Sequence, residues 1–485
     1  MVDHGGGLVE DLEKKTGLTA DQIVPLITLF FAFWVGHIFR IWLSPQRISS
    51  QKRHFISMAL GIIMLSIVFG EQAFHLLYSC LISYTLMRFV DTSVVHVWVM
   101  GSAMLYLSLI HFKRMMLQDD NYVVDISGPL MLATIKITYV GCGIHDKYHP
   151  RTTSDDARII LKKFPSPLEY LGYIFNFSSV FTGPPPEYQD YMDFIDGKQY
   201  DKYKDELKGK QPSPMLVSIQ KFILGYMAIG MYGFVSSIFK PDFYKTPELY
   251  ESSFWFKVMF AEIMVYHHKF KYYGAFGLGE SICNASGLGF SGVDEDRNPT
   301  WDKLKTLRPL QIEYATNIRG YVDCWNLTVN VWLKKCVYSR LKVIPFLGTW
   351  VFSALWHGFY SGYYTFFIPL GFALFLTRKV RRTIRPYFLS SPSLKLFYDV
   401  ITWFVTRLLL NFYAVGFATL NYAITFKFWN SASHYGTAIL LLGTLLVIVF
   451  QTQQQKKDHN QNDQSPSIST NGHPHVTNGN HNGSR

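Results

Sequence analysis

The feature that most constrains this chain is the recurrence of apolar stretches that approach the length of a bilayer crossing. One crossing as an α-helix takes about 20 residues. The stretches run from Ile23 to Leu43, Phe55 to Gly70, Ala73 to Val90, Val94 to Phe112, Met215 to Phe239, Phe254 to Tyr266, Pro345 to Thr377, Leu396 to Leu420 and Thr437 to Phe450. Within a bilayer the chain must satisfy its own backbone polar groups, so such stretches fold as helices. The pattern predicts an all-α polytopic membrane protein.

Two further apolar stretches, Gly128 to Ile144 and Leu168 to Phe181, are short or interrupted. Including them, we expect about 8 to 11 membrane segments, some re-entrant and some amphipathic. The composition agrees, because 49% hydrophobic and 17% charged residues are unusual for a soluble enzyme of 485 residues.

The sequence divides into three parts. Residues 1–22 form a polar leader without the basic start and small-residue cleavage site of a secretory signal, so Ile23 to Leu43 is expected to be a retained anchor. Residues 23–451 form one integral membrane domain. Residues 452–485 are rich in Asn, Gln, Ser, His and Gly, a composition that predicts a disordered tail.

The formal net charge of +11 does not indicate a nucleic-acid-binding protein, because the basic residues flank apolar segments. Gln51–His54 and Arg378–Arg385 are examples. Such clusters orient membrane helices. The Arg378–Arg385 cluster is also the best candidate in the sequence for contact with an anionic lipid or a coenzyme phosphate, and both interpretations stand at this point.

Neither the cysteines nor the paired histidines form a metal-site pattern. The five cysteines show no Cys-x-x-Cys spacing and no disulfide framework, so buried free thiols are expected. The pairs His145/His149 and His267/His268 lack convincing co-ligands. We expect no metal and no cofactor.

His357 lies inside the apolar run Val351 to Ile368. An ionisable side chain at membrane depth needs a reason, and imidazole can accept and return a proton near neutral pH. Ala354, Gly358 and Gly362 recur at four-residue spacing and predict a bare helical stripe beside it, along which a helix or an acyl chain could lie. A structural histidine bonded to a neighbouring helix is the alternative.

Asn326 lies in a second informative segment, Leu310 to Tyr338, which is compatible with an amphipathic helix. On such a helix Asp323, Asn326, Asn330 and Lys334 would form one polar stripe. A solvated face explains that stripe, and so does an amide that stabilises a developing oxyanion. Trp325 and Trp356 are expected either to line a cavity or to anchor helices.

These residues also carry a family resemblance. Trp325-Asn326 with Trp332-Leu333, followed by Ser353 to Gly358, resembles the signature of membrane-bound O-acyltransferases. The segments Gly183 to Tyr191 and Lys271 to Phe290 are similar to further blocks of that family, so the resemblance covers most of residues 23–450. Phe276 departs from the tryptophan of many relatives.

The resemblance implies helices around a central tunnel, with acyl-CoA as a co-substrate. It implies His357 as the catalytic base and Asn326 as its partner. Candidate substrate-binding residues are Trp325, Trp356, Gly358, Lys271, Tyr272 and Asn284.

Within the family, the run Gly287 to Asp294 and the segment Tyr387 to Pro392 are most similar to enzymes that acylate lysophosphatidylethanolamine or lysophosphatidylserine. The resemblance therefore implies phospholipid remodelling at the endoplasmic reticulum membrane, with membrane lipids as partners and no nucleic acid. Lysophosphatidylcholine, lysophosphatidic acid or another lipid remains an alternative acceptor. A transporter that uses His357 as a proton relay is a remote alternative, because no internal symmetry is visible.

Overall fold

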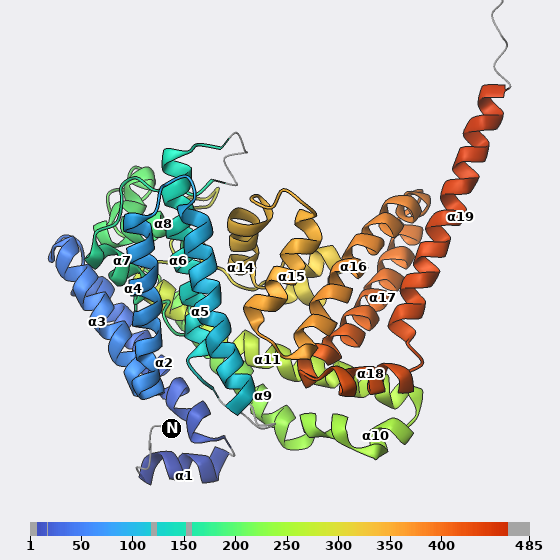
Figure 1. Ribbon diagram of the computed structural model, residues 1–485, viewed down its shortest axis with the longest axis horizontal. Coiled ribbons are helices and arrows are strands. Elements are labelled where there is room, and N and C mark those ends of the chain that lie inside the picture. The colour runs from blue at the N-terminus through green and yellow to red at the C-terminus, as the bar shows by residue number, and fades with distance from the viewer. Residues whose placement is uncertain (1–6, 17, 118–123, 152–157, 464–485) are drawn as a thin grey trace, which may run out of the picture.

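The computed structural model describes residues 7–16, 18–117, 124–151 and 158–463, and most of them are helical (Figure 1). A single two-stranded antiparallel ribbon, β1 (Gly292–Val293) with β2 (Pro299–Thr300), interrupts the helices of this described part. The prediction of an all-α polytopic membrane protein is confirmed.

Six stretches of the described chain are long and apolar enough to cross a membrane. Their outward faces carry large exposed apolar side chains such as Phe31, Leu216 and Leu441, as a lipid-facing surface requires. The stretches are α2 (Ala20–Ile41), Ser50–Phe89, α5 (Val95–Leu117), α9 (Met215–Ile238), α17 (Pro392–Thr419) and Tyr435–Gln453 within α19 (Tyr435–Asp463). The Ser50–Phe89 stretch comprises α3 (Ser50–Phe69), η1 (Gly70–Ala73) and α4 (Phe74–Phe89).

The 8 to 11 segments expected are counted differently, because Ser50–Phe89 alone contains two of the expected stretches. Several of the others belong to helices of other kinds. Phe254 to Tyr266 begins the 33-residue helix α11 (Phe254–Ser286), whose C-terminal part is buried in the protein. Pro345 to Thr377 is divided between α15 (Pro345–His357) and α16 (Ser361–Ile384). The helix α6 (Ser127–Tyr148) is buried on most of its surface.

The helices form two groups that share α11 (Figure 1). In the first, α2 to α6, α7 (Pro167–Ile174), α8 (Tyr188–Asp196) and α9 pack around a core that includes α6. In the second, α16, α17 and α18 (Tyr422–Ser431) pack with α19. Helix α11 packs along α9 and α2 and also against α17, so it holds the two groups together.

The shorter elements connect these helices. They are α1 (Gly7–Thr16), η3 (Lys198–Tyr203), η4 (Pro241–Lys245), α10 (Pro247–Glu251), α12 (Pro309–Glu313), α13 (Ile318–Val322), α14 (Leu327–Trp332), the π-helical turn η5 (Leu333–Tyr338) and η6 (Arg385–Phe388).

The two ends of the helix bundle differ in charge. The α15 start and the α16–α17 connection lie at one end, at the top of Figure 1. Arg340 and Lys342 come directly before α15 in the chain, and the arginines of 378–385 lie at the end of α16 and the start of η6. Helices α1 and α10 lie at the other end, and acidic residues outnumber basic ones in both. We call the first the basic end.

The prediction of one helix from Leu310 to Tyr338 is wrong. The chain instead forms α12, α13, α14 and η5 in succession. Asn317 begins α13 as an extended cap whose side chain accepts from the Gly320 N–H at 2.9 Å. Asn326 takes the left-handed conformation, with φ 49°, which ends any helix before it. The polar residues Asp323 to Lys334 therefore do not share one helical stripe.

The prediction of a small-residue stripe is also wrong, because Ala354, Gly358 and Gly362 do not lie on one helix. Helix α15 ends at His357, and Gly358 turns the chain with φ +123°. Gly362 instead allows close contact between α16 and the end of α17, where a Cβ would lie 2.2 Å from the Gly416 carbonyl oxygen.

At the termini, α1 lies inside the predicted polar leader. We predicted that the tail from residue 452 is disordered. Helix α19 instead continues to Asp463, so residues 452–463 are helical. Their glutamines and lysines favour helix and let it continue. Residues 464–485 of the predicted tail lie outside the described residues. All five cysteines are free and four are buried, as predicted.

Replacing Gly362 by alanine tests the contact between α16 and α17. The new methyl would meet backbone atoms at 2.2 to 2.6 Å, so we expect Gly362→Ala to lower the free energy of unfolding by about 1–3 kcal/mol. Gly101→Ala on α5, which has open space around the site, is the matched control and should be neutral or stabilising. Thermal denaturation in detergent measures both, and equal stability of the two variants would contradict the packing.

Candidate active site

His357 is the last residue of α15, and its ring is surrounded by aromatic side chains. The imidazole stacks on Phe367 of α16 at a centroid distance of 4.8 Å, with Tyr363 at 5.4 Å and Phe417 of α17 at 5.8 Å. The residue is half-buried, and its ring nitrogens form no hydrogen bond with any described residue. The imidazole is therefore held by packing, and its nitrogens have no hydrogen-bond partner among the described residues.

The turn after His357 is fixed by α5. The Nε2 of His111 lies 3.1 Å from the Trp356 carbonyl oxygen. The His111 ring also packs against Gly358, where a Cβ would approach its Cγ to 3.2 Å. With φ at +123°, Gly358 serves a conformation that other residues rarely adopt. Gly358 is thus placed as a turn residue beside His357.

Trp356 connects α15 to α6. Its indole Nε1 donates to the Met131 carbonyl at 3.3 Å, and its ring lies 5.4 Å from that of Trp332. The Trp332 indole in turn donates to Thr138 Oγ1 at 2.9 Å. Trp356 is only 3% exposed. These contacts favour the anchoring interpretation of Trp356 over cavity lining.

Asn326 is presented by a backbone bend. Its φ and ψ of 49° and 53° place it in the left-handed region, which asparagine tolerates better than most residues. The Asn330 amide nitrogen donates to the Val322 and Trp325 carbonyls, each at 2.8 Å, and so holds the bend. The Asn326 side chain itself forms no hydrogen bond within the described chain. Strained backbone with an unoccupied polar group is typical of functional sites.

A continuous set of ring contacts joins the two candidate catalytic segments. Trp325 lies 6.0 Å from Tyr272 on α11, Tyr272 lies 6.2 Å from Phe417, and Phe417 lies 5.8 Å from His357. We call Tyr272, Trp325, His357, Tyr363, Phe367 and Phe417 the aromatic cluster. The structure thus brings His357, Tyr272 and Trp325 into one cluster, with Asn326 next to Trp325 in the chain.

Glu313 is a site residue that the sequence analysis missed. Its carboxylate accepts from the Tyr266 and Tyr273 hydroxyls at 2.8 Å each and pairs with Lys269 and Arg407. The Tyr273 ring lies 6.1 Å from Trp325, so this network supports one side of the aromatic cluster. A sequence signal existed, since Tyr266, Lys269 and Tyr273 fall at i, i+3 and i+7 on one face of α11.

The remaining candidates lie in other surroundings. Lys271 is half-buried on α11, where its charge acts on His267 and His268. Asn284 is 2% exposed. With its amide oxygen and nitrogen exchanged, the nitrogen donates to the Trp301 carbonyl at 3.3 Å and the oxygen accepts from Lys221 Nζ at 3.2 Å. These partners give Asn284 a local structural role, and among the described residues no contact joins it to the aromatic cluster.

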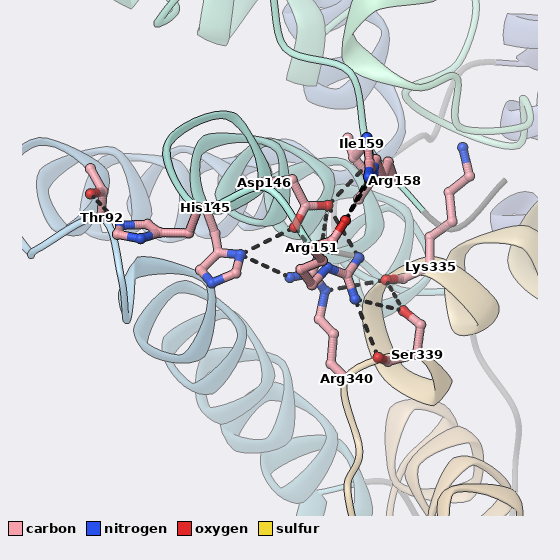
Figure 2. A network of polar contacts seen from close by, with 10 residues as sticks. Thr92, His145, Asp146, Arg151, Arg158, Ile159, Lys335, Ser339 and Arg340 are labelled. Carbon is pink, nitrogen blue, oxygen red and sulfur yellow. Dashed lines mark hydrogen bonds and ion pairs between the residues drawn. The ribbon is translucent and has the colours of Figure 1, made fainter. Parts of the chain in front are cut away.

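Figure 2 shows a second charged network, at the basic end. Asp146 at the end of α6 pairs with Arg151 at 3.0 Å and with Arg340 at 2.9 Å, and His145 lies 3.1 Å away. Burial disfavours the charged carboxylate, but these cationic partners outweigh it and hold the pKa of Asp146 below its ordinary value. Because Arg340 follows η5, the network anchors the segment that begins at Asn326.

The chain is similar to known proteins over most of its length. Residues 76–422 match the MBOAT, membrane-bound O-acyltransferase, family. The chain is 32% identical to human membrane-bound glycerophospholipid O-acyltransferase 2 over 468 residues, covering 94% of this chain and 90% of the relative. It is 33% identical to mouse membrane-bound glycerophospholipid O-acyltransferase 1 over 94% of this chain and 96% of the relative. A lysophospholipid acyltransferase of Schizosaccharomyces pombe is 29% identical over 85% of this chain and 84% of the relative.

Removing the Asp146 charge tests the network of Figure 2. Asp146→Asn leaves two buried guanidinium groups without their carboxylate, so we expect a loss of about 3–5 kcal/mol in unfolding free energy at neutral pH. Asp193→Asn, which breaks a pair with the exposed Lys162, is the control and should cost about 0–1 kcal/mol.

Comparing the stability of wild type and Asp146→Asn at different pH values tests whether the role of Asp146 is ionic. Because the folded-state pKa of Asp146 is depressed, its stabilisation is present above the unfolded pKa, about 3.9, and is lost as the pH falls through the folded value. The advantage of wild type over Asp146→Asn should therefore be constant from pH 8 to 5 and shrink below about pH 4. An advantage that persists unchanged at lower pH would contradict an ionic role.

Proposed function

The chain belongs to the membrane-bound O-acyltransferase family, and on that premise we propose that it transfers a fatty acyl group from acyl-CoA to the free glycerol hydroxyl of a lysophospholipid. The names of its relatives support the acceptor class, since they are glycerophospholipid and lysophospholipid acyltransferases. The head groups we favour are ethanolamine and serine, on the resemblance of Gly287 to Asp294 and Tyr387 to Pro392.

The observation that carries the proposal is the state of His357. A histidine kept only for structure would hydrogen-bond to a neighbouring helix. Here the ring is packed among Phe367, Tyr363 and Phe417, and its nitrogens are without partners in the described structure. A neutral imidazole in that state is ready to accept a proton from a bound hydroxyl.

The reaction then follows from the residues present. His357 removes the proton of the glycerol hydroxyl as its oxygen attacks the thioester carbonyl. The Asn326 amide donates a hydrogen bond to the oxyanion of the tetrahedral intermediate. Collapse breaks the carbon–sulfur bond, and the imidazolium returns the proton to the departing thiolate. The products are a diacyl phospholipid and free coenzyme A, with no net change in protonation of the enzyme.

The aromatic cluster protects this chemistry from water. Phe367, Tyr363 and Phe417 surround His357 at centroid separations of 4.8 to 5.8 Å. Tyr272 and Trp325 extend the cluster beyond Phe417. Excluding water favours the lipid hydroxyl as the nucleophile and strengthens the hydrogen bond to the oxyanion. The spanning helices make the protein multi-pass, and we propose the endoplasmic reticulum as its membrane.

Activity of the purified protein tests the proposal directly. With labelled acyl-CoA and a panel of lysophospholipids we expect a diacyl product. Lysophosphatidylethanolamine and lysophosphatidylserine should be preferred over lysophosphatidylcholine and lysophosphatidic acid. His357→Ala should lower kcat/KM by roughly 10²–10⁴-fold. His75→Ala, which removes a half-buried histidine on α4, should leave it nearly unchanged. A fully active His357→Ala would remove the base from the mechanism, and a lack of any acyl transfer by wild type would favour a transporter.

Asn326 allows its backbone and its amide to be separated. Glycine adopts the left-handed conformation without strain, so Asn326→Gly keeps the bend and removes only the side chain. If the amide stabilises the oxyanion, kcat should fall roughly 10²–10³-fold while thermal stability stays near that of wild type. Near-normal turnover of Asn326→Gly would show instead that the position matters only for the bend.

A further inference from the structure

A cavity at the basic end is lined by arginines from two separate parts of the chain. It measures about 370 Å³, within the range of roughly 300–1,000 Å³ typical of small-molecule sites. Arg378, Arg381, Arg382 and Arg385 line it from the end of α16 and η6, and Arg319 lines it from α13. We call this the arginine pocket.

The positive charge of this pocket is poorly neutralised. Arg319 pairs with Asp323 at 2.5 Å. In the part of the chain that the structure describes, no carboxylate forms an ion pair with any of the other four arginines. In addition, the Nη1 of Arg381 and the Nε of Arg385 are buried without a hydrogen-bond partner. Buried guanidinium donors without acceptors are costly unless a ligand supplies the acceptor.

An orientation signal alone does not explain this arrangement. Such a signal needs only positive charge in a cytoplasmic loop, wherever the side chains point. Here Arg319 lies far from the other four in sequence, and the chain folds so that all five meet around one cavity. Planar guanidinium groups converging in this way match the oxygens of phosphate.

The position of the pocket limits which phosphate can occupy it. Phe367, on which His357 stacks, and Arg378 to Arg385 lie on the same helix and its continuation, 11 to 18 residues apart. At about 1.5 Å rise per residue the separation along the axis is roughly 16–27 Å. The phosphate of a lysophospholipid lies only a few covalent bonds from the hydroxyl that reacts. A phosphate in the arginine pocket therefore does not belong to an acceptor bound at His357.

We propose that the arginine pocket is a second ligand site, one that binds a cluster of phosphate groups separate from the reacting acceptor. Two sources share this chemistry. One is the phosphorylated nucleotide end of a coenzyme A thioester, whose pantetheine arm would extend toward His357; the other is the head group of an additional anionic lipid. The extension of the pantetheine arm toward His357 rests on the proposed acyl transfer. The binding of phosphate groups by the arginines does not.

The location of the pocket agrees with both sources. It opens at the basic end, and the excess of Arg and Lys there over α1 and α10 places this end in the cytoplasm by the positive-inside rule. Coenzyme A in solution and anionic lipids of the cytoplasmic leaflet both reach a site on that side.

Binding to the purified full-length protein tests the site without requiring catalysis. The probes are coenzyme A, dephospho-coenzyme A and inorganic pyrophosphate, and isothermal titration calorimetry measures the binding of each. We expect Arg382→Gln and Arg385→Gln each to lower the affinity for a phosphate probe roughly tenfold. Lys379→Gln is the matched control, because it removes one positive charge from the same helix at an exposed residue that packs on Phe375. It should leave binding within about twofold.

The lipid source is tested in parallel. Wild type and the three variants are placed in nanodiscs of phosphatidylcholine alone or with phosphatidylinositol, and thermal unfolding is measured. Weakened coenzyme A binding in the arginine variants identifies the coenzyme. An increase in Tm with phosphatidylinositol that Arg382→Gln and Arg385→Gln lose, with coenzyme A binding intact, identifies the lipid.

Equal behaviour of the arginine variants and Lys379→Gln toward every probe would overturn the proposal. The Tm of each variant in phosphatidylcholine shows that it is folded. If arginine-dependent binding is found but no acyl transfer occurs, the proposed function fails and the phosphate site stands.

Discussion

A polar side chain can be held without a partner inside the protein only where the fold itself restrains the surrounding backbone. The two candidate catalytic groups both lie at such places. Asn326 is in the left-handed conformation before α14, and His357 ends α15 just before Gly358 at φ +123°. An uninterrupted helix would direct these side chains into ordinary helix packing. The two breaks instead present an amide and an imidazole whose hydrogen-bonding atoms have no partners in the described structure.

The rest of the structure explains why these breaks persist. The bend at Asn326 is held by the Asn330 amide, and the turn at Gly358 is held by His111 of α5. Charged networks then fix the helices that carry these restraints. Asp146 ties the end of α6 to the segment after η5, and Glu313 joins α11 to α17 through Lys269 and Arg407. Breaking a buried ion pair on one side is strongly destabilising, which makes these networks effective clamps.

The sequence predicted the helical membrane fold because apolar length is a local property that the bilayer enforces. It also singled out His357 and Asn326, through the rarity of a histidine in an apolar run and through the resemblance around Trp325 and Trp356. It could not predict the breaks. The periodicity of Leu310 to Tyr338 fits one helix, and only tertiary contacts such as Asn330 to Val322 select the bent form. Glu313 was missed because its partners lie far from it in the chain, three of them on α11 and the fourth, Arg407, on α17, so only the fold brings them to its carboxylate.

The central claim is that the partnerless imidazole of His357 and amide of Asn326 receive the reacting groups. An experimental structure with a lysophospholipid and a non-reactive thioether analogue of acyl-CoA measures this most directly. The claim requires a His357 ring nitrogen within about 2.6–3.2 Å of the acceptor hydroxyl, with the Asn326 amide facing the carbon that replaces the thioester carbonyl. A bound analogue whose reactive carbon lies outside the aromatic cluster, with both side chains still uncontacted, would contradict it.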